Sequence, residues 1–375
     1  MQKKVAVIFG GMSSENEISI ITGTMACNLI DSQKYAIYPV YLSVSGEFFY
    51  DSSLKDIKVF SQQNFIKKAS KAIIHGGKLC KIKSNKIKPV CKIDVILNCC
   101  HGKGGEDGLI SSIAQLNGIA NASPDALASA VFMDKAVTKL ISKSLAIKSV
   151  DYFKISKRDY EKRGKMALKC VESRLKYPVI VKPSKQGSSI GVVVAHDKLQ
   201  LINALDTAFN FDDIVIVEKF LTEKREINCA AYRKNGDVVV SECEEPILKQ
   251  EFLTFSDKYE NGDKERRSIF PAKISERQSV LIKSYTKLLY KRLDLRGVVR
   301  ADYIISGGEV YFNEMNTVPG SLAHYLFSEK FSDFKEILTD IIEQGLKDFH
   351  AQKAQTVKLD LGVINKLPTL HGKRL

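Results

Sequence analysis

The chain has 375 residues, 44% of them hydrophobic, and a formal net charge of +14. This length exceeds one ordinary hydrophobic core, so we expect two or three domains of a soluble globular protein. No run of about 18 apolar residues is present, and the N-terminus has no long apolar stretch. Neither a membrane span nor a signal peptide is therefore expected.

The distribution of charges and cysteines narrows the classes further. Lysine and arginine are scattered along the whole chain, without a nucleic-acid-binding motif. Positive potential also favours ATP and carboxylates, so we expect small-molecule ligands and no nucleic-acid partner. The eight cysteines show no CxxC spacing, and several lie in apolar runs such as "VILNCCHG". This pattern predicts reduced, buried thiols in a cytoplasmic protein.

The N-terminal third alternates strands with helices. "KKVAVIFGG" predicts a strand and a glycine turn, and Ser13 or Ser14 is the expected N-cap of the following helix. A strand and hairpin at 35–50 come next, and we interpret the lysine-rich segment 51–90 as an insertion. "KPVCKIDVILNCC" predicts one strand, which emerges into a glycine-rich loop before a helix at 109–119.

The remainder of the chain predicts two further α/β units. In the middle we expect a helix at 126–147, a strand pair joined by a Gly-Ser loop at 177–197, and a strand at 214–220. The later strands are expected at 225–234, 237–245, 297–306 and 309–316, with flanking helices at 275–293 and 332–348. The expected domains are 1–123, 124–217 and 218–350, followed by a basic tail at 351–375.

Two glycine-rich turns each connect a strand to a helix. "GGMSSENEIS" places Glu15 at a helix N-terminus, where a carboxylate could hold a ligand ammonium. "HGKGGEDG" carries four glycines, which allow close backbone approach to a ligand beside His101. Both turns also have structural interpretations. The first is then a helix cap, and the second holds a packed His101 while Glu106 and Asp107 cap the next helix.

A third loop, "VKPSKQGSSIGV", follows the strand lysine Lys182. Its glycines and serines expose amides and hydroxyls, a combination that binds phosphates. No G-K-[ST] closes the loop, so it is not a Walker A motif. The alternative is an ordinary hairpin loop.

The stretch "RADYIISGGEVYFNEMNTVPG" places polar side chains on two neighbouring strands. By the period of two, Glu314 and Asn316 share one face, and Met315 points to the other. Asp302 joins them only in one register. A two-residue loop would place Asp302 opposite Asn313, whereas an odd loop would place it opposite Glu314.

The expected odd loop has Gly308 in the left-handed region and Ser306 opposite Val310. In that register Asp302, Glu314 and Asn316 form an oxygen cluster beside Arg300. Two carboxylates and an amide suit Mg²⁺ or Mn²⁺ on nucleotide phosphates, and the lysine and Gly-Ser loop complete a phosphoryl-transfer apparatus. The alternative is an edge strand with a solvated polar face.

Over roughly residues 3–348 the sequence resembles the D-alanine–D-alanine ligases of the ATP-grasp superfamily. The motifs, in order, are "FGGMSSENEIS", "HGKGGEDG", "MDKAVTK", "VIVKPSKQGSSIGV", "VEKFLTEKREI", "DKY", "RADYI" and "NEMNTVPGS". The resemblance implies three α/β domains, the first Rossmann-like, with ATP between the second and third. It also implies a cytoplasmic homodimer that joins two D-alanines through an acyl phosphate.

The resemblance implies a role for each matching residue. The ATP-site residues would be Lys135, Lys182, Glu218, Lys219, Leu221 and Glu226. The ligands of two Mg²⁺ or Mn²⁺ ions would be Asp302, Glu314 and Asn316. The catalytic groups would be Glu15, Ser188, Tyr259, Arg300 and the amide of Gly320, and the D-alanine contacts would be Glu15, His101, Lys258, Tyr325 and Leu326.

Three departures from the family pattern stand out. Tyr325 occupies the position of a serine that helps hold the second substrate, "LTEKREI" is one residue longer than usual, and Asn16 replaces a commoner His or Arg. A ligase that uses D-serine or D-lactate as second substrate is the nearest alternative, although Tyr259 argues against D-lactate. A non-catalytic, nucleotide-binding paralogue is the alternative from another class.

Overall fold

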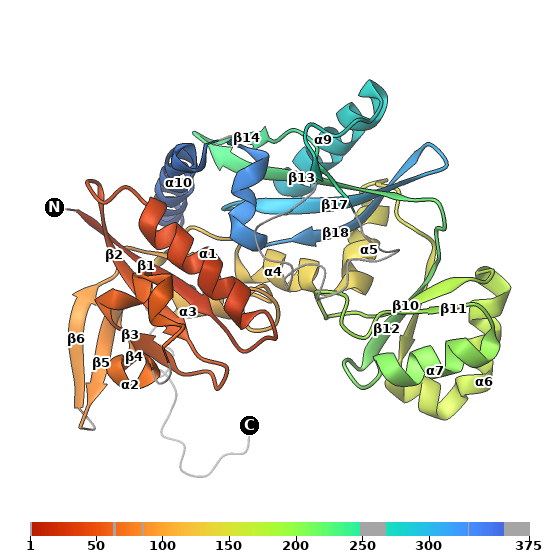
Figure 1. Ribbon diagram of the computed structural model, residues 1–375, viewed down its shortest axis with the longest axis horizontal. Helices are drawn as coiled ribbons and strands as arrows, with labels where there is room; N and C mark the ends of the chain where they lie inside the picture. Colours follow the sequence, from red (N-terminus) through yellow and green to blue (C-terminus); the bar gives the residue numbers. More distant parts are fainter. Residues whose placement is uncertain (1, 63–64, 85, 248–267, 329, 356–375) are drawn as a thin grey trace, which may run out of the picture.

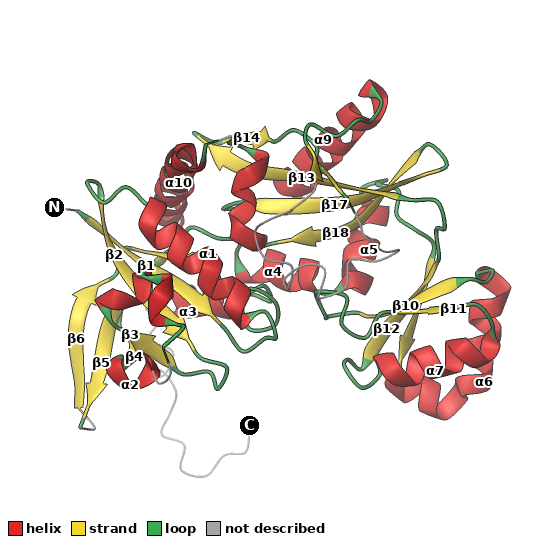
Figure 2. Ribbon diagram, viewed as in Figure 1, coloured by secondary structure: helices red, strands yellow, loops and turns green. Residues whose placement is uncertain are grey.

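Three larger β-sheets follow one another along the chain, with helices packed on their faces (Figure 1, Figure 2). The computed structural model describes residues 2–62, 65–84, 86–247, 268–328 and 330–355. Lys258 and Tyr259 lie outside the described residues. Within the described part, no helix has the length and apolar character needed to cross a membrane.

The N-terminal sheet has a parallel half built around β1 (Lys3–Gly10). β1 pairs with β2 (Tyr35–Leu42) and β7 (Val95–Asn98), and β8 (Ala120–Asn121) lies beyond β7. Residues 5–9 of β1 are fully buried because both faces of a parallel sheet are covered. The covering helices include α1 (Asn16–Leu29) and α3 (Leu109–Leu116).

The other half of this sheet is antiparallel and contains the segment that we interpreted as an insertion. Its strands are β3 (Phe48–Tyr50), β4 (Ser70–His75), β5 (Lys78–Lys83) and β6 (Lys86–Lys92), with the short helices η1 (Ser52–Lys55), η2 (Ile57–Val59) and α2 (Phe65–Lys68). The single strand expected at "KPVCKIDVILN" was wrong. It is two strands, because the chain leaves edge strand β6 and Asp94 accepts the Lys4 N–H before β7 begins.

The central sheet has the order β11-β10-β12-β9 and is antiparallel at each pairing. One face, with valines from β10 and β12, packs against helices that sequence analysis did not identify. The expected long helix at 126–147 is two helices, because Asp134 is extended and its carboxylate caps the second one. The elements are α4 (Ala126–Met133), α5 (Lys135–Ser144), β9 (Tyr152–Ser156), α6 (Lys157–Arg174), β10 (Val179–Pro183), β11 (Val193–Ala195), α7 (Lys198–Ala208) and β12 (Ile214–Lys219).

The third sheet has the order β14-β13-β17-β18. One face packs on α9. The other face is polar around Asp302 and Glu314, while Ala230 and Tyr232 of β13 pack on it in the apolar cluster that includes α10. A two-stranded sheet lies beside it. The elements are β13 (Arg225–Lys234), β14 (Asp237–Val240), β15 (Glu245–Pro246), β16 (Ser268–Ile269), α9 (Glu276–Arg292), β17 (Val299–Ser306), β18 (Glu309–Asn316), η3 (Gly320–Leu326), η4 (Phe331–Asp333) and α10 (Phe334–Gln355).

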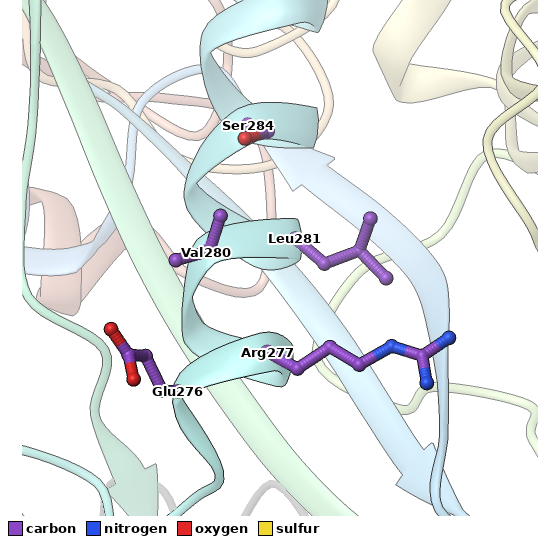
Figure 3. Close-up of a pocket in the computed structure, with 5 residues that line it drawn as sticks. All are labelled: Glu276, Arg277, Val280, Leu281 and Ser284. Atoms are coloured by element: carbon purple, nitrogen blue, oxygen red, sulfur yellow. The ribbon is translucent and has the colours of Figure 1, made fainter.

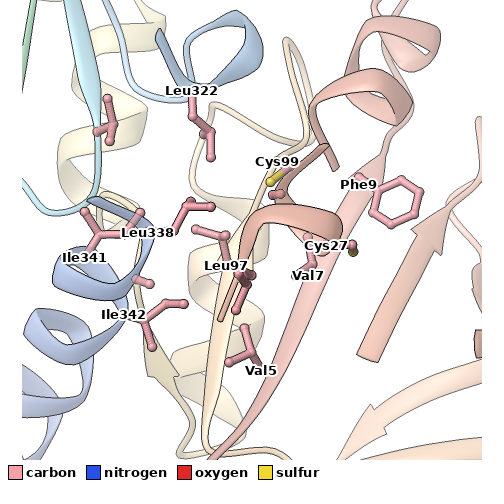
Figure 4. Close-up of a cluster of buried hydrophobic side chains, with 14 of the residues drawn as sticks. Val5, Val7, Phe9, Cys27, Leu97, Cys99, Leu322, Leu338, Ile341 and Ile342 are labelled. Carbon is pink, nitrogen blue, oxygen red and sulfur yellow. The ribbon is translucent and has the colours of Figure 1, made fainter. Parts of the chain in front are cut away.

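The last helix returns the chain to the N-terminal sheet. α10 extends to Gln355, so the first residues of the expected basic tail are helical. Figure 4 shows Leu338 and Ile342 of α10 facing Leu97 and Val5 of the first sheet in one buried cluster. This packing joins the two ends of the described chain and places the polar loops of the first and third sheets near each other.

Seven of the eight cysteines are buried and all eight are free thiols, which confirms the expectation of unpaired cysteines. Cys27 and Cys99 lie in the same cluster as α10 (Figure 4). Burial raises the pKa of the Cys100 thiol to about 12, so it remains protonated at neutral pH.

Gly23 lets α1 lie close to β1. A Cβ atom at Gly23 would be 2.2 Å from the Cβ of Phe9, which is fully buried. We expect G23A to lower the free energy of unfolding by about 1–3 kcal/mol through overpacking, despite the better helix propensity of alanine. Thermal and urea unfolding measure this change.

The matched control is G164A in α6, where the nearest atom to a new Cβ is 3.6 Å away. This variant should equal or exceed the wild type in stability, by up to about 1 kcal/mol. Equal effects of the two substitutions would show that the close contact of α1 with Phe9 does not limit stability.

Candidate active site

The register of β17 and β18 places Asp302 directly opposite Glu314, and Arg300 opposite Asn316. The expected three-residue turn was wrong. Ser306 pairs with Glu309 across a two-residue turn, Gly307-Gly308, whose φ angles are +56° and +80°. Such a turn alone would send Glu314 to the other face, but Asn313 is an extra residue in β18 that shifts the register. The bulge therefore brings the two carboxylates to one face.

The carboxylates on this face are bound to cations. Arg300 donates from Nε and Nη2 to the two oxygens of Asp302, at 2.7 Å each. Lys135 Nζ lies 3.3 Å from Glu314 Oε2. Asn316 Nδ2 donates to Asp302 Oδ2 at 2.9 Å. Burial opposes the charge of Arg300, yet Asp302 and the Tyr325 hydroxyl raise the pKa of the guanidinium well above its ordinary value.

This donor set fits a hard divalent cation. Paired residues of adjacent strands have Cβ atoms about 4.5–5.5 Å apart, close enough for Asp302 and Glu314 to share one ion or neighbouring ions. Among the described residues, no group of three or more His, Cys, Asp or Glu side chains is arranged to hold a metal ion. The third oxygen ligand would be Oδ1 of Asn316, which faces the carboxylates when the amide group is rotated by half a turn. Oxygen ligands of this kind suit Mg²⁺ or Mn²⁺.

Lys182 and Glu218 lie on the face of the central sheet opposite the valines that pack on α6 and α7. Lys182 Nζ donates to Glu218 Oε2 at 2.8 Å, while Lys139 Nζ lies 3.0 Å from Glu218 Oε1. Although burial alone would raise it, the two lysines lower the pKa of the Glu218 carboxyl to about 2. Sequence analysis missed Lys139. The spacing of four residues from Lys135 on α5 is the signal that could have identified it.

The other predicted nucleotide residues occupy the connection between the central and third sheets. Lys219 is exposed at the end of β12, and its N–H donates to Asp151 O at 3.0 Å. Leu221 is half-buried. Glu226 lies on the same face of the third sheet as Asp302, with Lys224 Nζ 3.2 Å from its carboxylate. The predicted residues thus line the region between the two sheets.

Glu15 connects the N-terminal sheet to the Gly-Ser loop. Ser188 donates a hydrogen bond to Glu15 Oε1, and Ser188 has a φ of +49° in the turn that presents its hydroxyl. The expected helix cap was wrong. Glu15 itself is the N-cap residue of α1 without a side-chain cap bond, and Ser13 instead donates to His101 O. Ser13 and Glu15 both contact loops outside α1, which is why neither caps it.

His101 is buried, and both of its ring nitrogens have protein partners. Nδ1 donates to Val318 O at 2.7 Å, so neutral Nε2 accepts from Thr22 Oγ1, also at 2.7 Å. Thr22 in turn accepts the Ser321 N–H at 3.0 Å. Burial lowers the pKa of His101, which favours this neutral form. These contacts agree with the interpretation of His101 as a packed histidine. Nothing in the sequence indicated the role of Thr22.

Glu106 bridges the glycine-rich loop to the segment before Gly320. Its two oxygens accept the N–H groups of Gly102 at 3.0 Å and Val318 at 3.1 Å. Thr317 Oγ1 also donates to Glu106 O at 3.2 Å. Glu106 therefore does not cap α3, whereas Asp107 accepts the Leu109 N–H at 3.2 Å. Burial, with smaller effects of Glu15 and Glu314, raises the pKa of the Glu106 carboxyl to about 8.

The short helix η3 carries the last predicted residues. It begins at Gly320, where a Cβ atom would meet none of the described residues within 4 Å, so among them space is open beside this amide. Tyr325 OH accepts from Arg300 Nη1 at 3.2 Å, which brings it beside the acidic face. Leu326 is buried in the cluster with α10. A separate cavity of about 470 Å³ lies along α9 and contains none of the predicted residues (Figure 3).

Comparisons with known proteins agree with this geometry. Models described as D-ala D-ala ligase N-terminus and C-terminus match residues 4–123 and 141–344. The D-alanine–D-alanine ligase of Thermosipho melanesiensis is 35% identical, with 95% of this chain and 97% of that protein covered. That of Campylobacter jejuni is 33% identical, with coverage of 91% and 93%.

Solved structures show the same relationship. The D-alanine–D-alanine ligase of Helicobacter pylori has a TM-score of 0.72 and 30% identity over 90% of this chain and 98% of that one. The VanG D-Ala:D-Ser ligase of Enterococcus faecalis has a TM-score of 0.78 and 27% identity, with coverage of 92% and 100%. A family match over both halves, with relatives above 30% identity along nearly the full length, leaves one assignment. The chain belongs to the D-alanine–D-alanine ligase family.

Proposed function

We propose that this protein joins two D-alanines to D-alanyl-D-alanine, a peptidoglycan precursor, with conversion of ATP to ADP and phosphate. One observation carries the proposal. In a chain of this family, Asp302, Glu314 and Asn316 share one polar face, and Lys135 links that face to the Gly-Ser loop. Lys135 Nζ also donates to Gln186 O at 2.7 Å, so one ammonium contacts both elements.

Asp302, Glu314 and Asn316 would hold Mg²⁺ or Mn²⁺. When bound, the metal supplies positive charge that stabilises the transferring phosphoryl group. Lys135 and Lys182 add protein charge toward the same phosphates, and Arg300 remains beside Asp302. The side chain of Glu218 is bound to two lysines, so we propose that the nucleotide base meets the backbone of residues 218–221 and that Glu226 lies at the ribose.

The remaining residues act on the amino acids. The Glu15 carboxylate would bind the ammonium of the first D-alanine, whose carboxylate takes the γ-phosphoryl group of ATP. The amine of the second D-alanine then attacks the acyl phosphate, and phosphate leaves. Arg300 and the Gly320 N–H would stabilise the oxyanion of that step. The Ser188 contact with Glu15 holds the Gly-Ser loop over the site, which excludes water that would hydrolyse the acyl phosphate.

The second D-alanine and the assembly of the protein are finer parts of the proposal. We assign the carboxylate of the second D-alanine to Lys258 and the region of Tyr325 and Leu326. We also propose that Tyr259 forms a hydrogen-bonded triad with Glu15 and Ser188. We also propose domain boundaries near residues 123 and 217, a homodimer, and a cytoplasmic location. His101 contacts the loop before Gly320 rather than offering a free nitrogen, so its contribution to the first substrate is positional.

Product identification tests the proposed reaction. The purified protein is incubated with ATP, Mg²⁺ and a panel of D-amino and D-hydroxy acids, and products are identified by mass spectrometry. We expect D-alanyl-D-alanine, with one ADP per dipeptide. A preference for D-serine or D-lactate as second substrate would change the specificity assignment. ADP formation that does not respond to D-alanine would identify a non-catalytic paralogue.

Glu314 offers a test of the metal assignment. We expect E314Q to lower kcat by at least about 10²-fold, because an amide replaces a charged oxygen ligand at the phosphoryl group. The fold should remain intact, as judged by circular dichroism and the thermal midpoint. The control is E309Q on the same strand, where the exposed Glu309 pairs with Lys148 at the sheet's surface. Normal turnover of E314Q in Mg²⁺ would remove Glu314 from the metal site.

Glu106 offers a test of pH dependence. Its carboxylate accepts two N–H groups, and below a pKa of about 8 the protonated acid loses one of these acceptors. We therefore expect the ratio of wild-type to E106Q kcat to rise as pH increases through about 8, toward about tenfold. The comparison cancels the titration of the substrate amine, which is common to both proteins. A ratio that stays constant from pH 6.5 to about 9.5 would contradict this role of Glu106.

A further inference from the structure

A buried cluster beside the proposed nucleotide site carries more positive than negative charge. It consists of Lys139, Glu218 and Lys182, whose side chains are 2%, 3% and 12% exposed. Each oxygen of Glu218 binds one ammonium, so these three side chains have two cations for one anion, while the carboxylates of Glu314 and Glu226 act on Lys182 from farther away. The remaining contacts of Lys139 are uncharged: Nζ donates to Val150 O at 3.3 Å and lies 5.4 Å from the centre of the Tyr152 ring.

This excess charge is not explained by folding stability. Lys182 alone would neutralise Glu218, and burial of a second ammonium costs several kcal/mol in desolvation. A methionine in place of Lys139 would leave the neutral Lys182–Glu218 pair in a dry environment. The arrangement is therefore suited to a ligand that brings negative charge to the cluster.

The two lysines differ in how accessible they are to such a ligand. Lys139 projects from α5 onto Oε1 of Glu218 from the inner side, whereas Lys182 takes Oε2 and retains more exposure. Because Glu218 divides its charge between two cations, it holds the Lys182 ammonium less tightly than in an isolated ion pair. The same helix carries Lys135, which contacts Glu314 and Gln186 O.

We propose that Lys139 is a positioning residue of the ATP site, which engages one oxygen of Glu218 and so leaves the Lys182 ammonium available to an ATP phosphate. This inference rests on the nucleotide site of the proposed function. It makes no use of the identity of the amino-acid substrates.

Direct nucleotide binding to K139M tests the inference. Titration calorimetry with Mg·ATP in the absence of D-alanine measures Kd, and steady-state kinetics give KM for ATP and for D-alanine. We expect Kd and KM for ATP to rise about tenfold, because Glu218 then pairs with Lys182 alone. KM for D-alanine and the thermal midpoint should stay near their wild-type values. The matched control is K143M, an exposed lysine one helical turn later on α5, which should bind ATP as the wild type does.

The double variant K139M/E218Q separates positioning from a purely structural role. It removes one cation and one anion, and the neutral amide no longer holds the Lys182 ammonium. We expect it to bind ATP more tightly than K139M, within about threefold of the wild type. Should K139M not fold, the double variant alone decides: affinity within this range supports the inference.

Three results would overturn the inference. The first is an unchanged ATP affinity in folded K139M, and the second is a loss of ATP affinity in K139M that K143M shares. The third is a double variant that binds ATP no more tightly than K139M does. Where K139M is unfolded, the third result is a double variant that binds ATP at least tenfold more weakly than the wild type. Failure of the proposed function has a different signature. The wild-type protein would then bind ATP but make no D-alanyl-D-alanine, and the binding comparison would remain valid.

Discussion

The site depends on a single register shift between two strands. The turn at Gly307-Gly308 sets β17 and β18 in a pairing that would leave Glu314 facing α9, and the extra residue Asn313 reverses this. Side chains alternate across a strand, so one inserted residue moves every following side chain to the opposite face. Asp302 and Glu314 meet only because of this bulge. The metal assignment requires that meeting.

Charge balance around the acidic face comes from elements distant in the sequence. Arg300 belongs to the same strand as Asp302, whereas Lys135 reaches Glu314 from α5 and also contacts the Gly-Ser loop. The protein thus brings together one cation from a strand and one from a helix where carboxylates would otherwise repel each other in a partly buried region. Binding of a divalent cation and a triphosphate would exchange these protein ion pairs for ligand contacts. Preorganised charges of this kind reduce the reorganisation needed during phosphoryl transfer.

Sequence periodicity predicted most strands of the parallel half of the first sheet and of the other two sheets, because the pattern of side chains along a strand is a local property. It missed β4 and β5, which lie in the segment interpreted as an insertion, and β9 of the central sheet. It placed Glu314 and Asn316 on one face and Met315 on the other, as the structure has them. The bulge at Asn313 depends on packing across strands and leaves no local pattern. The roles of Thr22, Glu106 and Lys139 were missed for the same reason: each acts through a partner more than 75 residues away. The family motifs, and not periodicity, related Glu15 to the distant Ser188, which contacts it in the structure.

The N-terminal sheet has a physical role in the proposed chemistry although it holds none of the proposed metal or phosphate ligands. Thr22 accepts the Ser321 N–H, His101 donates to Val318 O, and Glu106 accepts the Val318 N–H. These three bonds fix the segment on both sides of Gly320. The packing of α10 on the first sheet resists separation of the two parts. An amide aimed at an oxyanion must hold its direction during the reaction. The first sheet therefore supports the loop after β18 that we propose presents the Gly320 amide to the oxyanion.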